Sequence, residues 1–397
     1  MSHPQRIGVV GAGTMGAGVA ALACRSGYGT VLRDVDPDAL ERARQRHAAS
    51  LRRAVERGEM TPDRERDALQ RLELTTDVDR LSCCALIVEA APEREGLKAR
   101  ILAELATTAP RAVLASNTSS ISIAALAADA DPERVLGLHF FNPPAAMPLV
   151  ELVRTARTTD IAVRHARRFA EALGKTVVEV PDGPGFLVNR CARPFYLEAL
   201  RIVEDGQADP ATVDRACCEL GGFPMGPFEL MDVVGLDVGL AATESMWRQG
   251  HGEPRWRPSP LHIRMVADGR LGAKCDAGGF YRPGEGWRDA GRGTEPVDGA
   301  AIVIRIVAQL VNEAHFAVAE GVAAVEDVDR ALELGLRHPR GPFAWQARYG
   351  AATIVDTLDQ LWSIEHDQRY RVAPSLRRGE RSAARPPART PADRQRR

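Results

Sequence analysis

The chain has 397 residues, of which 45% are hydrophobic, and its formal net charge is −1 at pH 7. This length supports two or three globular domains, and the charge balance argues against nucleic acid as a specific partner. The seven scattered cysteines lack CxxC spacing, which indicates reduced thiols rather than disulfides or a metal site. No apolar run approaches membrane-spanning length and no signal peptide precedes the first strand, so we expect a cytoplasmic protein without a membrane segment.

The first part of the chain, residues 1–185, alternates short apolar strands with helices. Its sequence predicts a strand at 7–10, a glycine turn, a helix and a second strand that ends at Asp34. Two charged helices are expected between residues 38 and 75, separated near Gly58. Further strands are expected in "ALIVEAAP", "AVLASNTSS", "VLGLHFF", "LVELVR" and "KTVVEVPD". This alternation predicts an α/β fold with a Rossmann-type doubly wound sheet.

The composition changes after residue 185. Helical periodicity over residues 186–283 predicts an all-α domain. A linker rich in glycine, arginine and proline, residues 284–298, precedes a second helical block over 299–375. The last residues, 376–397, are basic, rich in proline and poor in core residues, so we expect a disordered tail there.

The two helical blocks are copies of one unit. A shift of 115 residues aligns them without a gap over nearly sixty residues, and it superposes Glu198-Ala199 on Glu313-Ala314, Val213–Ala216 on Val328–Ala331, and Gly226–Phe228 on Gly341–Phe343. Polar positions fare differently, because Asn189 falls on Ile304 and Glu229 falls on Ala344. The second copy therefore keeps packing residues and loses polar ones, and we interpret it as architectural.

A glycine-rich loop follows the first strand. Gly11, Gly13 and Gly16 form G-x-G-x-x-G, a spacing that allows a tight turn, close approach of a pyrophosphate, and close packing of helix on strand. Asp34 closes the second strand, eighteen positions after Gly16, where its carboxylate can bind an adenosine ribose and repel the 2′-phosphate of NADP. Although Arg33 lies beside it, this arrangement favours NAD as the cofactor.

A histidine ends the apolar strand in "GLHFFNPPAAMPLVEL". His139 alone could be a core histidine, but Glu151 lies in the next apolar segment and also needs a partner. A His–Glu pair would fix the imidazole tautomer and stabilise the imidazolium, as is required of a base that takes the hydroxyl proton while the alcohol's hydride leaves to nicotinamide. Ser119 and Asn189 are neutral donors suited to substrate oxygens. Asn142, before a proline, could equally be a turn residue.

A basic stripe follows one face of the helix after Asp36. Its members, at spacings of four, three and four, are Arg46, Ser50, Arg53 and Arg57. A solvated basic face explains the stripe without a function. A track for the phosphates of a nucleotide-bearing thioester is the functional alternative.

Together these motifs resemble the L-3-hydroxyacyl-CoA dehydrogenase (3-hydroxybutyryl-CoA dehydrogenase) family over residues 5–283. The resemblance is carried by "GVVGAGTMGAGVA", "LIVEAAPE", "ASNTSS", "GLHFFNP", "PDGPGFLVNR" and "GFPMGPFELMDVVGLDV". It implies an NAD-dependent oxidation of a (3S)-3-hydroxyacyl thioester, such as 3-hydroxybutyryl-CoA, to the 3-ketoacyl thioester. His139 would be the base, paired with Glu151, and Ser119 and Asn189 would contact the substrate.

The resemblance also assigns residues to the two ligands. NAD contacts would come from Gly11, Gly13, Thr14, Met15, Gly16, Asp34, Glu93, Lys98, Asn142 and Lys274. Ser50 matches a coenzyme A contact, and Arg57 stands where the family usually has lysine. Only three of the 52 basic residues are lysines, and two of them, Lys98 and Lys274, fall on the cofactor positions. Around Lys274, "KCDAGGFY" departs from the Lys-Thr-Gly of the family.

Three alternatives remain open from the sequence. The same chemistry could act on a substrate bound to an acyl carrier protein, because both carriers present a phosphopantetheine arm. The short-chain β-hydroxyacid dehydrogenases with a catalytic lysine share the glycine loop, although a His139–Glu151 pair argues against them. A non-catalytic dinucleotide-binding protein, as in crystallin-type relatives, is the alternative outside enzymes.

The duplicated helical block resembles long members of the family, including 3-hydroxyadipyl-CoA dehydrogenases. Many shorter members dimerise through the first helical domain. We therefore expect residues 299–375 to pack on residues 186–283 as an internal pseudo-dimer within a monomer, with a homodimer as the alternative.

Overall fold

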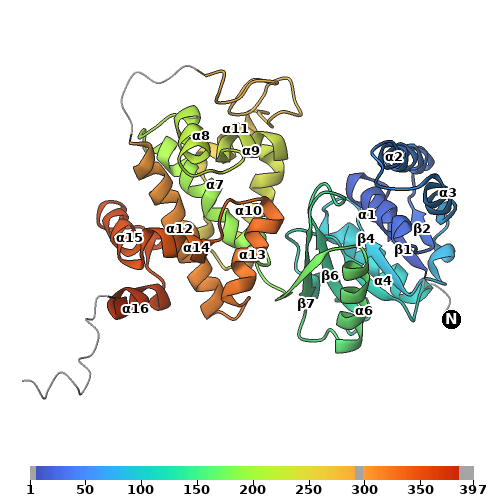
Figure 1. The fold of residues 1–397 in the computed structure, drawn as a ribbon. Coiled ribbons are helices and arrows are strands. Elements are labelled where there is room, and N and C mark those ends of the chain that lie inside the picture. Colours follow the sequence, from blue (N-terminus) through green and yellow to red (C-terminus); the bar gives the residue numbers. More distant parts are fainter. Residues whose placement is uncertain (1–5, 291–297, 384–397) are drawn as a thin grey trace, which may run out of the picture. The chain divides into compact units, whose positions relative to one another are not determined.

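The computed structural model describes residues 6–290 and 298–383, which divide into two compact units. The first unit contains the described residues up to Asn189 together with Leu334–Leu336. The second contains residues 190–333 and those from Arg337 onward. Figure 1 shows that the first unit holds the sheet and that the second is helical.

An eight-stranded sheet forms the centre of the first unit. The strands are β1 (Ile7–Val10), β2 (Thr30–Arg33), β3 (Leu72–Thr75), β4 (Leu86–Glu89), β5 (Val113–Ser116), β6 (Val135–Phe140), β7 (Leu149–Arg154) and β8 (Thr176–Pro181). Their order is β3-β2-β1-β4-β5-β6-β7-β8, and only the β6–β7 pair is antiparallel. The predicted Rossmann-type sheet is confirmed. Strand β3 was missed because all four of its residues are only half-buried, which leaves no clear apolar pattern.

Helices cover the sheet on both faces, as Figure 1 shows. They are α1 (Thr14–Arg25), α2 (Pro37–Glu56), α3 (Pro62–Gln70), α4 (Glu95–Thr108), α5 (Ile123–Leu126) and α6 (Asp160–Ala172), with a 3₁₀ turn, η1 (Val78–Leu81). Asp36 accepts from Asp38 N at 2.9 Å and so caps α2, while Thr61 caps α3. The expected pair of charged helices separated near Gly58 is confirmed.

The second unit repeats one order of helices twice. The first copy is α7 (Val188–Glu204), α8 (Pro210–Glu219), α9 (Pro227–Val234), α10 (Leu236–Gln249), η2 (Pro254–Trp256) and α11 (Pro260–Ala267). The second is α12 (Gly299–Ala319), α13 (Val325–Leu336), α14 (Pro342–Tyr349), α15 (Ala351–Glu365), η3 (Gln368–Tyr370) and α16 (Pro374–Ala383). Helices α9 and α14 begin and end 115 residues apart, so the repeat in sequence is a repeat in structure.

The same capping device starts α9 and α14. Asp214 accepts from the backbone N–H groups of Phe228 (2.9 Å) and Glu229 (2.8 Å), and Asp329 accepts from those of Phe343 (2.8 Å) and Ala344 (3.0 Å). These contacts satisfy donors that the first turn of a helix leaves unpaired. A Cβ at the preceding glycine, Gly226 or Gly341, would strike the aspartate side chain, which explains a glycine at that place in both copies.

Buried ion pairs join the two copies reciprocally. Arg190 Nε lies 2.7 Å from Glu313 Oε1, and Arg305 Nε lies 2.5 Å from Glu198 Oε1. Each arginine and each glutamate of one pair has its counterpart, 115 residues away, in the other pair. Such an exchange is the mark of a two-fold interface.

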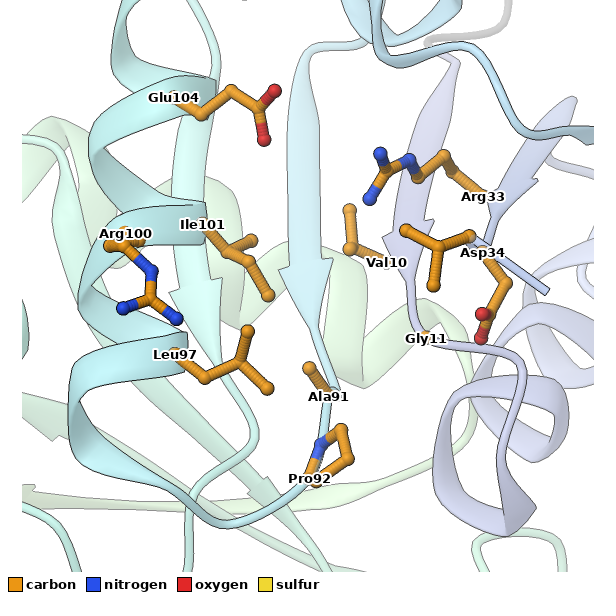
Figure 2. Close-up of a pocket in the computed structure, with 11 residues that line it drawn as sticks. Val10, Gly11, Arg33, Asp34, Ala91, Pro92, Leu97, Arg100, Ile101 and Glu104 are labelled. Atoms are coloured by element: carbon orange, nitrogen blue, oxygen red, sulfur yellow. The ribbon is translucent and has the colours of Figure 1, made fainter.

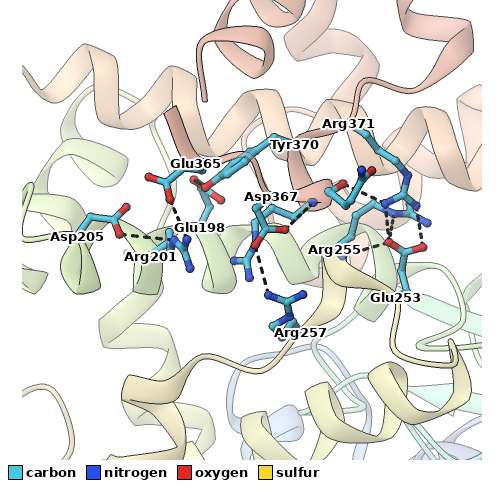
Figure 3. Close-up of polar contacts among 12 residues, drawn as sticks. Glu198, Arg201, Asp205, Glu253, Arg255, Arg257, Glu365, Asp367, Tyr370 and Arg371 are labelled. Atoms are coloured by element: carbon cyan, nitrogen blue, oxygen red, sulfur yellow. Dashed lines mark hydrogen bonds and ion pairs between the residues drawn. The ribbon is translucent and has the colours of Figure 1, made fainter. Parts of the chain in front are cut away.

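A second set of polar contacts, shown in Figure 3, follows the same rule. Arg371 binds Glu253 at 2.7 Å, and Arg257 lies 3.5 Å from Asp367. Glu253 corresponds to Asp367, and Arg257 to Arg371, each at a distance of 114 positions. The offset is 114 rather than 115 because the second copy has one residue fewer before η3 than the first has before η2. The two copies also share one hydrophobic core. Phe195 and Phe228 of the first copy belong to the same cluster of buried side chains as Val307, Trp345 and Leu358 of the second.

Helix α12 corrects one expectation from the sequence. It is the one helix among residues 6–290 and 298–383 that is long and apolar enough to cross a membrane, with a mean hydropathy of 1.4. However, 78% of that stretch is buried within the protein, and its Arg305 and Glu313 form the buried ion pairs between the copies. A core helix of this kind meets the same criteria, so the feature is weak evidence for a membrane.

The predicted disordered tail is also partly wrong. Residues 376–383 belong to α16, and Leu376 is fully buried in the core shared by the two copies. Helix α16 is the counterpart of α11, but the two start 114 residues apart rather than 115, so the gapless repeat in the sequence does not extend to them. Residues 384–397, and residues 291–297 of the predicted linker, lie outside the described residues.

Candidate active site

The glycine loop connects β1 to α1 with its backbone open to a ligand. Gly11 has φ +103°, and a Cβ there would lie 2.7 Å from Ala90 O, so only glycine fits. A Cβ on Gly16 would overlap Gly11 O, which confirms close packing of α1 on the strand. Gly13 has no atom within 4 Å of a Cβ position and begins α1 without a side-chain cap. The helix N-terminus is thus left available for a pyrophosphate.

Two side chains hold the peptide of Ala12 in this loop. Asp34 Oδ2 accepts from Ala12 N at 2.6 Å, and its Oδ1 accepts from Asp36 N at 3.0 Å. Arg46 Nη2 donates to Ala12 O at 3.0 Å. Arg46, which the sequence placed on a basic stripe, therefore supports the glycine loop from α2.

A cavity of about 530 Å³ opens beside the loop, at the carboxyl ends of β1, β2 and β4 (Figure 2). Its walls are Val10, Gly11, Arg33, Asp34, Val35, Ala91, Pro92, Leu97, Arg100, Ile101 and Glu104. Apolar walls with an acid at the end of the second strand suit an adenosine, because such ligands bind at this edge of a doubly wound sheet. The residues present therefore fit NAD.

His139 and Glu151 lie opposite each other on the antiparallel strands β6 and β7. His139 Nδ1 is 2.6 Å from Glu151 Oε2, and Glu151 Oε1 accepts from the backbone N–H groups of Leu187 (3.0 Å) and Val188 (2.8 Å). Glu151 is fully buried and His139 is 6% exposed. The pair predicted from the sequence is formed, and the start of α7 holds its carboxylate.

Phe186 prepares the backbone for this contact. It has φ +51°, an uncommon left-handed conformation for a bulky residue, and the next two residues are those that donate to Glu151. Its ring lies 6.1 Å from that of His139, and the ring of Phe141 lies at 4.5 Å. No pattern in the sequence marked this backbone geometry.

Ser119, Asn189 and Glu93 form a second group. Glu93 Oε1 accepts from Thr118 Oγ1 (2.5 Å) and Ser119 N (2.9 Å), and Asn189 Nδ2 donates to Ser119 O at 2.9 Å. Because Asn189 directly follows Val188, it connects this group to the His139–Glu151 pair. The structure thus brings the four predicted catalytic side chains into one unit.

Lys98 lies behind Glu93 rather than at the surface. It is 1% exposed, and its ammonium binds Glu89 (3.0 Å) and Glu93 (3.3 Å). Burial opposes ionisation of Glu93, but the Lys98 charge and the hydrogen bonds from Thr118 and Ser119 outweigh it and lower the pKa of Glu93. Direct contact of Lys98 with NAD is not supported by this burial.

The other predicted ligand contacts are more dispersed. Asn142 is exposed and Ser50 is half-buried on α2. Arg57 follows the last residue of α2 and makes an exposed ion pair with Glu59 at 2.6 Å. Lys274 belongs to the second unit, where it pairs with Asp237.

The third lysine, Lys175, has a structural task that the sequence did not reveal. Its ammonium donates to the carbonyl oxygens of Pro144 (2.5 Å) and Met147 (2.8 Å), in the loop between β6 and β7. Burial lowers the pKa of Lys175. The scarcity of lysine in the chain was the only sequence signal for this residue. The structure gives the reason for a lysine here, since a compact ammonium with three donors suits a site where carbonyl oxygens converge.

The geometry defines a dinucleotide-binding dehydrogenase with a histidine–glutamate pair at its centre. The family models for the NAD binding domain and the C-terminal domain of 3-hydroxyacyl-CoA dehydrogenase match residues 6–183, and residues 185–282 and 302–381, respectively. The chain belongs to the 3-hydroxyacyl-CoA dehydrogenase family, and it is an oxidoreductase that uses NAD.

Similar proteins are of two kinds, one that matches nearly the whole chain and one that matches 70% of it. A 3-hydroxyadipyl-CoA dehydrogenase of Escherichia coli is 34% identical over 95% of this chain and 98% of its own length. A 3-hydroxybutyryl-CoA dehydrogenase of Mycobacterium tuberculosis is 46% identical over 70% of this chain and 98% of its own length. The crystal structure of an E. coli 3-hydroxybutyryl-CoA dehydrogenase superposes with a TM-score of 0.89 at 33% identity, covering 96% of this chain and 99% of that one.

Proposed function

We propose that this protein oxidises (3S)-3-hydroxyacyl-CoA thioesters to 3-ketoacyl-CoA, and catalyses the reverse, with His139 as the base. The observation that carries the proposal is the 2.6 Å contact between His139 Nδ1 and Glu151 Oε2, in the unit that also holds the glycine loop. When bound, NAD⁺ supplies the acceptor for the hydride that leaves the alcohol carbon.

The hydrogen bonds of Glu151 select the tautomer of His139. A carboxylate only accepts, and one oxygen of Glu151 is taken by two backbone N–H groups, so the other receives the Nδ1 proton of His139. The neutral imidazole then carries its lone pair on Nε2, the atom that accepts the substrate hydroxyl proton. Glu151 stabilises the imidazolium that results.

Ser119 and Asn189 supply the substrate contacts in this proposal. The hydroxyl of Ser119 donates to the reacting oxygen, and Asn189 holds the Ser119 backbone in place through its 2.9 Å hydrogen bond. Glu93, Asn142 and Lys274 are proposed NAD contacts, and Lys98 acts by fixing Glu93.

Coenzyme A is the proposed carrier, with Ser50 and Arg57 as its contacts, because relatives of both lengths are named for CoA thioesters. The test compares NADH oxidation with acetoacetyl-CoA and with acetoacetyl-acyl carrier protein. We expect turnover with the coenzyme A thioester. Turnover with the carrier protein alone would replace the carrier, and turnover with neither would contradict the proposed reaction.

Replacing His139 with alanine tests the base. His139→Ala is expected to lower kcat by roughly two to four orders of magnitude, because general-base catalysis contributes that much, while NADH still binds. His165→Ala, a change on α6 in the same unit, serves as the control and should retain kcat. Near wild-type turnover by His139→Ala would reject the assignment.

The proposed assembly is a cytoplasmic monomer with an internal pseudo-dimer. The reciprocal ion pairs Arg190–Glu313 and Arg305–Glu198, together with the single core formed by both helical copies, support it. An interface that closes on itself within one chain leaves no need for a second subunit.

A further inference from the structure

Helices α8 and α13 are counterparts that end differently. Helix α8 ends at Glu219, which corresponds to residue 334, but α13 continues for two more residues to Leu336. Its last three residues, Leu334–Leu336, belong to the first unit, whereas residues 219–221 belong to the second. The longer helix therefore adds a segment of the second copy to the unit that holds the catalytic pair.

Gly335 lies in this segment with no space for a side chain. A Cβ there would lie 2.8 Å from Leu149 Cδ2, 3.4 Å from Val188 Cγ2 and 3.5 Å from Phe141 Cε1. Glycine within a helix costs about 1 kcal/mol relative to alanine, so its presence needs a reason. Close approach to these three side chains provides one.

Each of the three neighbours lies beside a member of the catalytic pair, in the chain or in space. Leu149 precedes Glu151 by two residues on β7, so the two side chains point to the same face of the sheet. The ring of Phe141 lies 4.5 Å from that of His139, and Val188 N donates to Glu151. A side chain at residue 335 would therefore meet residues that adjoin both His139 and Glu151.

The counterpart of Gly335 in the first copy is Leu220, whose side chain is 56% exposed. The repeat therefore does not itself require glycine at this position. The requirement arises in the second copy alone, where the helix end packs against Leu149.

We propose that the last turn of α13 is a positioning element for the His139–Glu151 pair, and that Gly335 is the residue that admits it. This inference rests on the proposed role of His139 as the base. It gives the second copy, which the sequence presents as architectural, a part in catalysis through Leu149, Phe141 and Val188.

Adding a side chain at residue 335 tests the inference. Gly335→Leu is expected to lower kcat with acetoacetyl-CoA by about 10- to 100-fold, because a shift near 1 Å in a catalytic group can cost that much. Gly335→Ala should cost several-fold, since the end of the Leu149 side chain can move. The KM for acetoacetyl-CoA and the Kd for NADH should stay within about twofold, because a positioning residue acts on the chemical step and the cavity beside the glycine loop is not lined by this turn.

Matched variants separate positioning from general damage. Gly379→Leu adds the same side chain at an exposed helical glycine with no atom within 4 Å of its Cβ position, and it should keep kcat. Leu220→Gly, the converse change in the first copy, should also keep it. Leu149→Ala in the Gly335→Leu background makes room and should recover at least part of the lost kcat.

A folded Gly335→Leu variant with wild-type kcat would overturn the inference, as would a fall in kcat matched by equal losses in NADH affinity. If Gly335→Leu is insoluble, Gly335→Ala decides by the same criteria. His139→Ala measured in parallel keeps the two proposals apart. An inactive His139→Ala beside an active Gly335→Leu rejects the positioning role alone, whereas an active His139→Ala rejects the base.

Discussion

The two helical copies share a fold and the polar residues that maintain it, but they differ at the residue that contacts Ser119. Both keep the aspartate that caps a helix, Asp214 or Asp329, and both keep the glutamate of the reciprocal ion pairs. Only the first copy has the asparagine that reaches Ser119, because its counterpart is Ile304. The capping and ion-pair residues are needed in each copy to form the fold, whereas a contact with Ser119 is made by the first copy alone.

Removing the second copy is the harshest way to test this comparison. A chain that ends at residue 290 loses half of the shared core, including Val307, Trp345 and Leu358 (members from three helices). We expect it to dimerise through the exposed face or to become insoluble, because such a face would be a large apolar patch. Analytical ultracentrifugation distinguishes these outcomes, and a well-behaved monomer would contradict the pseudo-dimer.

Breaking the reciprocal ion pairs one at a time should have the next largest effect. Glu313→Ala removes the buried carboxylate that Arg190 and Arg255 share. Because Arg190 keeps Glu320 and Arg255 keeps Glu253, a loss of about 3 kcal/mol of unfolding free energy is expected, at the lower end for a broken buried pair. Glu198→Ala takes one carboxylate from a single arginine, Arg305, which keeps Asp205, and should cost less. Chemical denaturation measures both, with the exposed Glu326→Ala as the control. Equal losses of unfolding free energy in the two variants would contradict the prediction that Glu313 contributes more to stability than Glu198.

His338 makes the second unit sensitive to acid. It meets its own counterpart, Phe223, at 5.1 Å between ring centroids, and burial lowers the pKa of His338 to about 4. A histidine in the unfolded chain has a pKa of about 6.5, so between pH values of about 6.5 and 4 the unfolded chain binds a proton that the folded chain does not. The free energy of unfolding therefore falls as the pH drops from about 6.5 toward 4. The shift corresponds to a loss on the order of 3 kcal/mol.

Phenylalanine at residue 338 would remove this dependence. His338→Phe should show a smaller difference in unfolding free energy between neutral pH and pH values near about 4.5, measured by denaturant titration. His366→Phe, at an exposed position, is the matched control and should keep the wild-type dependence. A variant that remains as acid-sensitive as the wild type would place the titrating group elsewhere.

Local patterns were sufficient for much of the fold. The strands that end at Val10 and Arg33 were predicted from short apolar runs beside a glycine turn, and the helix at 37–56 from Asp36 and Pro37 at its start. Strand β3 escaped because its residues are half-buried, and α16 escaped because a basic surface hid one buried residue, Leu376.

The site divides in the same way. The pairing of His139 with Glu151 could be predicted because two polar residues in apolar strands need each other. The backbone donors at Leu187 and Val188 could not, since every residue has an N–H and only the left-handed turn at Phe186 aims them. The sequence marked Lys98 and Arg46 as candidate ligand contacts, but it did not predict their partners, Glu89 and the carbonyl oxygen of Ala12.

The sequence by itself determined most of the elements, the glycine loop, the pairing of His139 with Glu151 and the existence of a repeat, because each depends on residues close in the chain or on a fixed spacing. Only the tertiary structure decided which copies exchange ion pairs and why Gly335, rather than its counterpart Leu220, must lack a side chain. Those facts depend on which surfaces meet, and burial against a distant segment leaves no periodic trace in the sequence.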